Sequence, residues 1–389
     1  MPDSDRADRI HTAPCVLQVL PALDVGGVER GTLEMAQAIT EAGGRALVAS
    51  AGGRMVPGLE RRGGEHVLIP DMPAKQPFRI LRNARTLERL IHLEDVRLVH
   101  ARSRAPAWAA YRAARRMNVP FVTTYHGVYS ESFPFKRHYN AVMAKGDRVI
   151  AISQHVAALV AQRHGVGPDR LRIIPRGVDP LLFDPAMITG PRIQRLVQQW
   201  QLPEGDVFSL VLMPARFSRW KGQHILLDAL ARLQRADVIC VFIGGDKGQQ
   251  DYARSLMERA KENGIAGQIR LGGICDDMPA ALSLADCVVH ASLEAEPFGR
   301  TVIEAQAMGR LVIASDLGGP RETVEHGVSG LLVPPGDVEA LAVALAETLA
   351  LPPDVRAEAG WRARQKVLER YTTDAMQRAT LDVYNELLG

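Results

Sequence analysis

The sequence of 389 residues lacks most of the signatures of metal-dependent and redox enzymes. Its four cysteines are scattered and form no C-x-x-C pair, so we expect buried thiols in a reducing compartment rather than disulfides or metal ligands. The only Asp-x-Asp sequence is Asp3-Ser4-Asp5, in a polar segment, so no metal site for a diphosphate is expected in the folded body. The motifs of P-loop kinases, α/β-hydrolases and zinc peptidases are also absent.

Long apolar runs are lacking as well. No stretch approaches the ~18–20 apolar residues of a membrane span, and the first apolar run is broken by Gln18, Pro21 and Asp24, so we expect no secretory signal. We therefore expect a cytoplasmic protein. If it meets a membrane, we expect peripheral contact with the cytoplasmic face of the inner membrane. Residues 1–180 carry 26 Lys and Arg against 17 Asp and Glu. This excess indicates an acidic partner or an anionic membrane face, or is an accident of an Arg-rich composition.

Strand-like and helix-like segments alternate along the whole chain, which predicts an α/β protein with parallel sheets. The length favours two domains. We expect an N-terminal domain at 1–180, a proline-rich linker at 181–206, a C-terminal domain at 207–372 and a C-terminal helix at 373–389 that packs back on the first domain. The expected strands are 16–20, 46–49, 67–69, 98–100, 121–124, 149–152, 172–174, 208–213, 238–243, 268–271, 287–290 and 311–314, with helices at 30–42, 80–92 and 106–117 among them.

The most informative segment contains two carboxylates eight positions apart, Glu296 and Glu304, separated by Phe298-Gly299 and the start of a helix. Both can face one crevice at the helix N-terminus, where free N–H groups favour a phosphate. A ribose diol can donate twice to one carboxylate. The pattern therefore predicts a cradle for a nucleotide-sugar; the alternative is a surface helix with scattered glutamates.

Three further segments are candidates for the same site. Arg216 and Lys221 are five residues apart, just before a helix, and two cations so placed suit a diphosphate. Because no metal ligands are evident, these two side chains would have to neutralise the diphosphate in place of a metal cation. The alternative is a solvated basic loop. Gly26 and Gly27, between the first strand and a helix, let a backbone approach a phosphate or sugar, or form a plain turn. His126, after a strand, could hydrogen-bond a sugar or make a structural hydrogen bond.

These residues, taken in order, resemble the retaining glycosyltransferases of family four, which have the GT-B fold of two facing Rossmann-like domains and an inter-domain cleft. The match covers nearly the whole chain. The segments 100–108 and 123–129 are similar to bacterial transferases of the lipopolysaccharide core. The matching elements are Gly26-Gly27, His126-Gly127, Ala151-Ile152-Ser153, Ile174 to Asp179, Arg216 with Lys221-Gly222, Glu296 to Gly299 with Glu304-Ala305, and Gly318-Gly319 with Glu322.

The resemblance implies roles for these residues. Arg216 and Lys221 would hold the diphosphate, Glu296 the donor-sugar hydroxyls and Glu304 the ribose diol, while His126 would contact the donor sugar near the reacting carbon. The catalytic set is thus His126, Arg216, Lys221 and Glu296. The donor-binding set is Gly26, Gly27, Arg216, Lys221, Glu296, Phe298, Gly299, Arg300, Thr301 and Glu304.

Two features of the match concern charge. Arg300 stands where the family usually has an apolar residue, so it either adds a phosphate contact or faces solvent. Gly27, Arg102 and Arg104 would lie on the acceptor side, and the two arginines suit an acidic acceptor such as a Kdo-bearing or phosphorylated lipid; the alternative is helix-entry charges that never touch substrate.

The expected function is that of a metal-independent, retaining glycosyltransferase without a cofactor. It would move a hexosyl group, with GDP-mannose favoured as donor by the subfamily resemblance, to a lipopolysaccharide-core or other lipid-linked surface glycan. The expected partners are the nucleotide-sugar donor and an acidic glycolipid or glycan acceptor, with no nucleic acid. Two alternatives stay open: a nucleotide-sugar 2-epimerase of the same fold, and a non-catalytic nucleotide-sugar binding protein.

Overall fold

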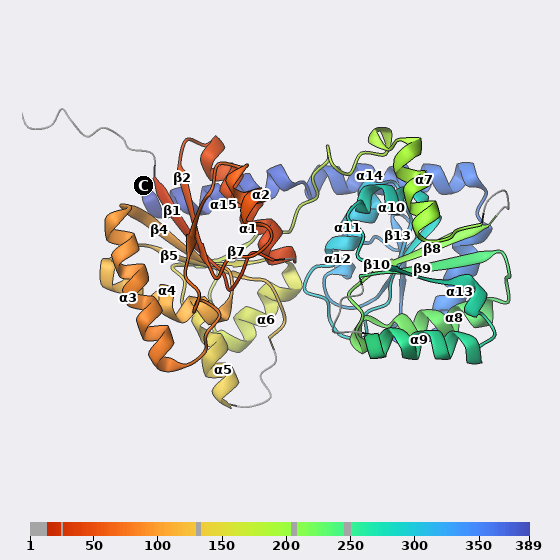
Figure 1. Ribbon diagram of the computed structural model, residues 1–389, viewed down its shortest axis with the longest axis horizontal. Helices are drawn as coiled ribbons and strands as arrows, with labels where there is room; N and C mark the ends of the chain where they lie inside the picture. The colour runs from red at the N-terminus through yellow and green to blue at the C-terminus, as the bar shows by residue number, and fades with distance from the viewer. Residues whose placement is uncertain (1–13, 25, 130–133, 204–207, 245–249) are drawn as a thin grey trace, which may run out of the picture. The chain divides into compact units, whose positions relative to one another are not determined.

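The structure is a computed structural model that describes residues 14–24, 26–129, 134–203, 208–244 and 250–389. It divides into two compact units. The first comprises Met1–Ile152, Val156–Ile174 and Gln377–Gly389, and the second Ser153–His155 and Pro175–Met376. Each unit has its own sheet, with helices on both faces (Figure 1).

The first unit is built on a seven-stranded parallel sheet with the order β3-β2-β1-β4-β5-β6-β7. The inner strands β1, β4 and β5 are almost entirely buried, as expected for a parallel sheet that is covered on both faces. The order reverses between β1 and β4, and ligands bind at such a switch point in open α/β sheets. The strands are β1 (Cys15–Val19), β2 (Arg45–Ser50), β3 (Glu65–Leu68), β4 (Val96–Ala101), β5 (Phe121–Tyr125), β6 (Arg148–Ala151) and β7 (Leu171–Ile173).

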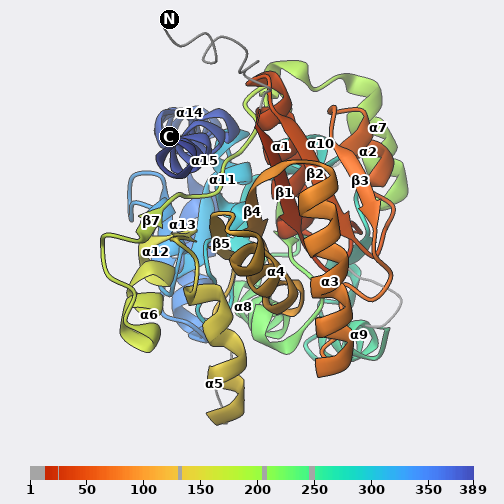
Figure 2. The same ribbon diagram turned by 90° about the vertical axis from the view of Figure 1, so that its left-hand side faces the viewer.

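Right-handed crossovers place the helices of the first unit on opposite faces of its sheet. One face carries α1 (Gly27–Glu41) and α2 (Val56–Glu60), together with the C-terminal helix α15 (Thr373–Leu388) (Figures 1 and 2). The other face carries α3 (Pro77–Leu93), α4 (Arg104–Met117), α5 (Pro134–Asn140), the short 3-10 helix η1 (Ala141–Ala144) and α6 (Gln154–His164).

The C-terminal helix is joined to the first unit by buried polar contacts. The Tyr384 hydroxyl lies 2.6 Å from Nδ1 of His100, whose Nε2 lies 2.7 Å from the Thr124 hydroxyl. Burial raises the pKa of Tyr384 to about 12, so the hydroxyl stays protonated. At the helix end, Glu386 accepts hydrogen bonds from Arg148 and Arg172. Residues 377–389 thus belong to the first unit although the chain reaches them from the second.

The second unit has a six-stranded parallel sheet with the order β10-β9-β8-β11-β12-β13. Here the order reverses between β8 and β11, which pair through Val211 and Cys287. The strands are β8 (Ser209–Pro214), β9 (Val238–Ile243), β10 (Ile269–Gly273), β11 (Cys287–His290), β12 (Val312–Ser315) and β13 (Gly330–Val333).

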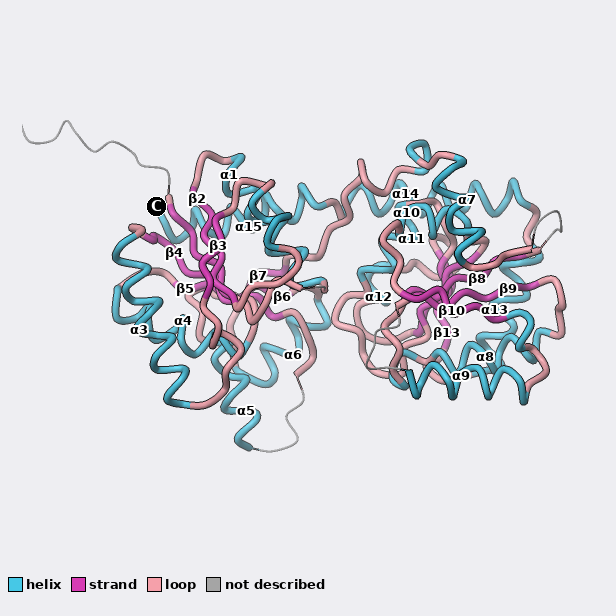
Figure 3. Tube along the Cα trace, in the orientation of Figure 1, coloured by secondary structure: helices cyan, strands magenta, loops and turns pink. Residues whose placement is uncertain are grey.

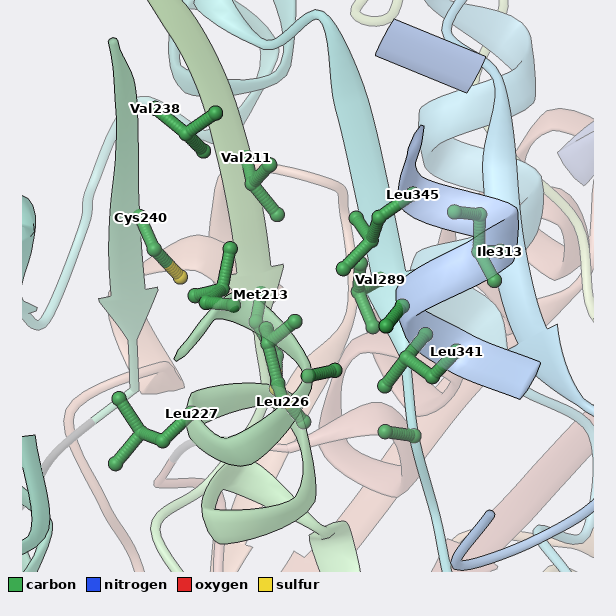
Figure 4. Packing of buried hydrophobic residues seen from close by; sticks show 14 of the residues in the cluster. Val211, Met213, Leu226, Leu227, Val238, Cys240, Val289, Ile313, Leu341 and Leu345 are labelled. Atoms are coloured by element: carbon green, nitrogen blue, oxygen red, sulfur yellow. The ribbon is translucent and has the colours of Figure 1, made fainter. Parts of the chain in front are cut away.

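Two groups of helices cover this second sheet (Figure 3). Against one face, Val211 and Met213 of the sheet pack with Leu226 and Leu227 of α8 and with Leu345 of α13 (Figure 4). The helices of this face are α8 (Gln223–Leu233), α9 (Gln250–Glu262) and α13 (Val338–Ala350), and those of the other face include α10 (Met278–Leu284), α11 (Arg300–Ala307), α12 (Pro320–Thr323) and α14 (Pro353–Arg370).

The segment 181–206, expected to be a linker, contains structure of its own. The 3-10 helix η2 (Pro185–Met187) is followed by helix α7 (Gly190–Gln199), whose Arg192 forms an ion pair of 2.6 Å with Asp277. Trp200 is buried, with 3% of its surface exposed. The prolines suggested a linker, but a proline in the first turn of a helix is favourable. The described part of this segment therefore belongs to the second unit.

Among the helices that can be described, none combines the length and the apolar character that crossing a bilayer requires. Within the same residues, no three His, Cys, Asp or Glu side chains are grouped so as to hold a metal ion.

Candidate functional site

Two loops of the second unit meet at the carboxyl edge of its sheet. Strand β8 leads into the loop that carries Lys221, and β11 leads into the loop that carries Glu296. Because the two strands are parallel neighbours, both loops leave the sheet at the same edge. The backbone N–H of Leu293 donates to the carbonyl of Trp220 over 2.7 Å and so joins one loop to the other.

The centre of this cluster is an ion pair between Lys221 and Glu296. The ammonium contacts the carboxylate oxygen Oε2, and the two side chains are 13% and 18% exposed. The same ammonium lies 4.1 Å from the centre of the Trp220 ring, a distance typical of a cation–π interaction. Lys221 is therefore held between a carboxylate and an aromatic face, with a small part of its surface accessible.

Glu296 is kept ionised by its surroundings. Nε2 of His290 lies 3.6 Å from Oε2 of Glu296, and the Ser292 hydroxyl lies 3.5 Å from the same oxygen. Burial alone would raise the pKa of Glu296, but His290 and Lys221 together lower the pKa to about 2. At neutral pH the carboxylate therefore only accepts hydrogen bonds.

Close backbone packing explains the glycines that flank this cluster. A Cβ atom on Gly319 would clash with the backbone of Phe298, and the Gly319 N–H donates to the Glu296 carbonyl over 2.8 Å. A Cβ atom on Gly222 would clash with the carbonyl oxygen of Ala291, and its φ of 78° also favours glycine. These two positions fix the loops that carry Glu296 and Lys221.

The second carboxylate, Glu304, lies in helix α11. Gly299 caps this helix with a φ of 84°, and Arg300 at its first position places Nε 3.5 Å from Oε1 of Glu304. The Glu304 side chain is 6% exposed. The ring of Phe298 is buried and packs edge-on against Tyr371, with the ring centres 5.7 Å apart. The ring of Phe298 is thus used in packing rather than turned toward a ligand at the helix N-terminus.

The remaining candidates of the second unit are Arg216, after β8, and Thr301, in α11. Arg216 is exposed and forms no ion pair with the residues that the structure describes, while its carbonyl accepts a hydrogen bond of 3.0 Å from Gln223. Thr301 is half-buried at the second position of α11. Arg216 can therefore turn toward an anion at the loop before α8 without giving up an ion pair.

In the first unit, His126 follows β5 and is half-buried. Gly27 is the first residue of α1, and a Cβ atom there would meet no heavy atom within 4 Å, whereas one on Gly26 would contact the side chain of Glu29. Packing within the described residues thus does not require glycine at position 27. The open space leaves the N-terminus of α1 accessible, which suits the expected approach of a phosphate or sugar.

Arg102 is placed differently from the expectation that it faces an acidic acceptor. The side chain is inside the first unit, 2% exposed, and its Nε donates to Oε1 of Gln18 over 2.7 Å. Burial lowers its pKa, while Tyr384 and Glu34 raise it. The long apolar stem and the position after a strand were compatible with either placement. Because the guanidinium is buried against Gln18, Arg102 is not available to an acceptor at the surface.

Arg104 has a more open setting. Its guanidinium lies 4.0 Å from the centre of the Tyr129 ring and donates to Oδ1 of Asn140 over 2.8 Å. The side chain is half-buried, so one edge of the guanidinium can still meet an acceptor group.

The structure therefore groups Lys221 with Glu296, and Arg300 with Glu304, on the second unit, and it places His126, Gly26 and Gly27 on the first. Sequence reasoning missed His290, Ser292 and Trp220. The signal for His290 and Ser292 was their position at the end of an expected buried strand, where polar side chains face the carboxyl edge. Trp220 directly precedes Lys221 and could have been found as its cation–π partner.

The chain matches known protein families over most of its length. Residues 25–181 match the model of Glycosyltransferase Family 4, and residues 194–366 that of the glycosyl transferases group 1. A D-inositol 3-phosphate glycosyltransferase of Jonesia denitrificans is 33% identical over 309 residues, which are 72% of this chain and 70% of that protein.

Two solved structures are similar to the whole chain. A glycosyltransferase of Rickettsia africae has a TM-score of 0.89 and 34% identity, covering 97% of this chain and 99% of its own. HepE of Anabaena, solved with UDP-glucose, has a TM-score of 0.83 and 25% identity, covering 96% of this chain and all of its own. The two parallel-sheet units match the GT-B fold of these proteins. Together with the family models and the relative from Jonesia denitrificans, this match shows that the chain belongs to the family 4 glycosyltransferases and uses a nucleotide-sugar.

Proposed function

We propose that this glycosyltransferase moves a hexosyl group from a nucleotide diphosphate sugar to a lipid-linked surface glycan, with retention of configuration and without a metal ion. The observation that carries the proposal is the Lys221–Glu296 pair at the carboxyl edge of the second sheet, beside the N-terminus of α11. In this pair, Lys221 supplies a cation for the leaving diphosphate, and the ionised Glu296 can accept hydrogen bonds from sugar hydroxyls.

The donor would be bound by groups of different kinds. Glu304, four residues into α11, would accept the ribose hydroxyls, and the backbone N–H groups at the start of α11 would meet a phosphate. Lys221 and Arg216 would bind the diphosphate. A carboxylate has about four acceptor sites, so Glu296 can keep its contact with Lys221 and still accept from a sugar hydroxyl.

In the proposed reaction, the bond between the anomeric carbon and the phosphate oxygen breaks while the acceptor oxygen attacks from the same face. The leaving phosphate oxygen takes the proton of the acceptor hydroxyl, and Lys221 with Arg216 stabilises the charge that develops on the diphosphate. His126 would contact the donor sugar near the reacting carbon. The ionised Glu296 carries no proton at neutral pH, so we assign it to sugar binding rather than to acid catalysis.

The identity of donor and acceptor rests on relatives and on charge. HepE is described with UDP-glucose, which favours a uridine donor, whereas the likeness to lipopolysaccharide-core transferases favours GDP-mannose. The relative from Jonesia denitrificans is named for D-inositol 3-phosphate, which favours a phosphorylated acceptor. Arg104 would suit such an anion. We place the reaction at the cytoplasmic face of the inner membrane, where a lipid-linked acceptor would be met.

A donor screen followed by an acceptor assay tests this proposal. A nucleotide-sugar at about 100 times its dissociation constant should stabilise the fold by ~2.7 kcal/mol, which a thermal-shift panel with UDP-glucose and GDP-mannose would detect. The stabilising donor is then incubated with and without a phosphorylated glycolipid extract, and nucleotide release and the anomeric configuration of the product are followed by NMR. Release without a new glycosidic bond, or conversion of the donor alone into its C2 epimer, would contradict the proposal.

Activity is expected to survive chelation of divalent metals. The diphosphate would be neutralised by Lys221 and Arg216, and no metal-binding group of His, Cys, Asp or Glu occurs among the described residues. The measurement is turnover after dialysis against EDTA, compared with turnover in added magnesium or manganese. Complete loss in EDTA that either metal restores would show that the two cations do not replace a metal ion.

Replacing Gly27 by alanine is expected to lower transfer without lowering stability. The added Cβ would meet no other side chain or distant backbone atom within 4 Å, and alanine loses less backbone freedom on folding than glycine, so thermal unfolding should occur at the same or a higher temperature. Gly190, the first residue of α7, is also surrounded by open space, and Gly190→Ala is the matched control. Equal activity of both variants would remove Gly27 from the proposed binding surface.

A further inference from the structure

A fully buried glutamine contacts the loop that carries Arg216. Gln223 is the first residue of α8 and has 0% of its surface exposed. Its Nε2 donates to the carbonyl of Arg216 over 3.0 Å and lies 3.5 Å from the carbonyl oxygen of Ala215. Breaking such a contact would leave a buried N–H group and a carbonyl without partners, which is costly. The Gln223 amide therefore fixes the backbone from which the Arg216 side chain projects.

A second residue sets the orientation of this amide. The hydroxyl of Tyr252, in α9, donates to Oε1 of Gln223 over 3.4 Å, and Nδ1 of His224 lies 3.3 Å from the same hydroxyl. Burial raises the pKa of Tyr252, so the hydroxyl keeps its proton at neutral pH. Because one end of an amide only accepts and the other only donates, a donor at Oε1 turns the Nε2 hydrogens toward the loop.

The backbone is fixed on both sides of Arg216, whereas the Arg216 side chain is exposed. Before it, the N–H of Ala215 donates to the carbonyl of Ile243 over 2.9 Å. After it, Phe217 is buried in the core of the second unit, with 4% of its surface exposed. A long side chain on a fixed backbone has less freedom to lose when it binds a ligand. The loop is thus arranged to present a guanidinium from a constant position.

We propose that Gln223 is a positioning residue for the donor diphosphate, which holds the Arg216 backbone so that the guanidinium meets the phosphates, with Tyr252 orienting the amide. The inference rests on the proposed role of Arg216 in binding the diphosphate. Gln223 itself would not touch the donor, because it is fully buried. It would contribute to donor affinity and turnover only through the arginine. A purely structural amide would instead contribute to stability alone.

Titration of UDP and of GDP into four forms of the full chain, in EDTA, tests this dependence. The forms are the wild type, Arg216→Ala, Gln223→Met and the double variant. Methionine has about the length of glutamine but no N–H to donate. With Arg216 present, Gln223→Met should lower the affinity for the diphosphate that binds on the order of tenfold, the scale of one lost charged contact. Without Arg216, it should lower the affinity by less than about twofold.

Gln268→Met is the matched control. The Gln268 amide also donates to a backbone carbonyl of the second unit, that of Arg235, over 2.9 Å. These two residues precede the parallel strands β10 and β9, so they lie at the amino edge of the sheet, opposite the candidate site. The variant loses an equivalent hydrogen bond and should keep the affinity of the wild type. Thermal unfolding of every form separates loss of stability from loss of binding.

Tyr252→Phe tests the same path with a milder change. It removes the hydroxyl that donates to Gln223 and leaves the ring in place, so it keeps the experiment decisive if Gln223→Met does not fold. We expect a severalfold loss of affinity that again requires Arg216. Turnover with the stabilising nucleotide-sugar should fall in the same variants and in the same order, because the arginine would also meet the charge that develops on the diphosphate.

Three results would overturn the inference. Unchanged affinity in folded Gln223→Met or Tyr252→Phe would show that the arginine does not depend on this contact. An equal loss from Gln223→Met with and without Arg216 would show that the amide does not act through the arginine. Unchanged affinity in Arg216→Ala would remove the assignment of Arg216 and the inference with it, whereas the first two results leave the proposed transfer intact.

Discussion

Replacing Lys221 by alanine is expected to lower turnover by a factor on the order of 100 to 1,000, the usual cost of one lost electrostatic contact to developing charge. The ammonium would face the leaving diphosphate, and in the structure it also pairs with Glu296, which is 18% exposed. Its removal would therefore weaken stabilisation of the leaving group and leave a largely buried carboxylate without its cation. Steady-state turnover of purified protein, with thermal unfolding measured in parallel, gives the comparison.

Arg219 offers a matched control for this variant. It lies two residues before Lys221 in the same loop and is exposed, so Arg219→Ala removes the same charge from the same segment without touching Glu296. This control should retain most of its turnover. A folded Lys221→Ala variant that kept more than half of the wild-type turnover would refute the assignment of Lys221 to the diphosphate.

Replacing Glu304 by glutamine is expected to weaken donor binding more than it slows the reaction. A ribose contact lies far from the bond that breaks, so it should contribute equally to the ground state and the transition state, and its loss raises the Michaelis constant. Hydrogen bonds to charged groups contribute about 1.5–3 kcal/mol, which corresponds to a rise of about tenfold to a hundredfold. Glu296→Gln should also lower turnover, because its proposed contacts are on the reacting sugar.

The ion pair of Glu304 requires its own control. Arg300 lies 3.5 Å from Glu304, so Glu304→Gln also removes the negative charge that pairs with this arginine. Arg300→Leu separates the two effects: if Arg300 only faces Glu304, this variant should retain donor affinity, and if it contacts phosphate, affinity should fall. Loss of turnover at an unchanged Michaelis constant for Glu304→Gln, with the reverse for Glu296→Gln, would require the two carboxylate roles to be exchanged.

Much of the fold could be predicted because buried parallel strands leave a strong pattern. Strand Val238–Ile243 is a continuous apolar run, and Cys287–His290 is apolar up to its last residue; the bounds of both agree with the prediction. Strand β13 (Gly330–Val333) was missed because it is only four residues long and two of them are half-buried. Helix α7 was missed because its first-turn proline suggested a break. The local sequence pattern therefore does not predict short elements and helix starts, because tertiary packing determines whether these segments become ordered.

The candidate site was predictable only in part, for a related reason. Their location in the same half of the chain and the family resemblance indicated that Lys221 and Glu296 serve one site, but not that they contact each other across two loops joined by the Leu293 backbone. The position of Arg102 after a strand was compatible with a surface role, yet the Gln18 side chain binds it inside the unit. Contacts between segments far apart in the chain depend on which strands are neighbours, and a single sequence does not reveal that order.

The most direct test of a metal-free diphosphate site at the ends of β8 and β11 is calorimetric titration of the stabilising nucleotide-sugar into the full chain in EDTA. We predict one donor bound per chain, with an affinity that falls more than tenfold in Lys221→Ala and stays unchanged in Arg219→Ala, since a charged hydrogen bond contributes about 1.5–3 kcal/mol. Binding that requires a divalent cation, or that is equally strong in Lys221→Ala, would contradict the account.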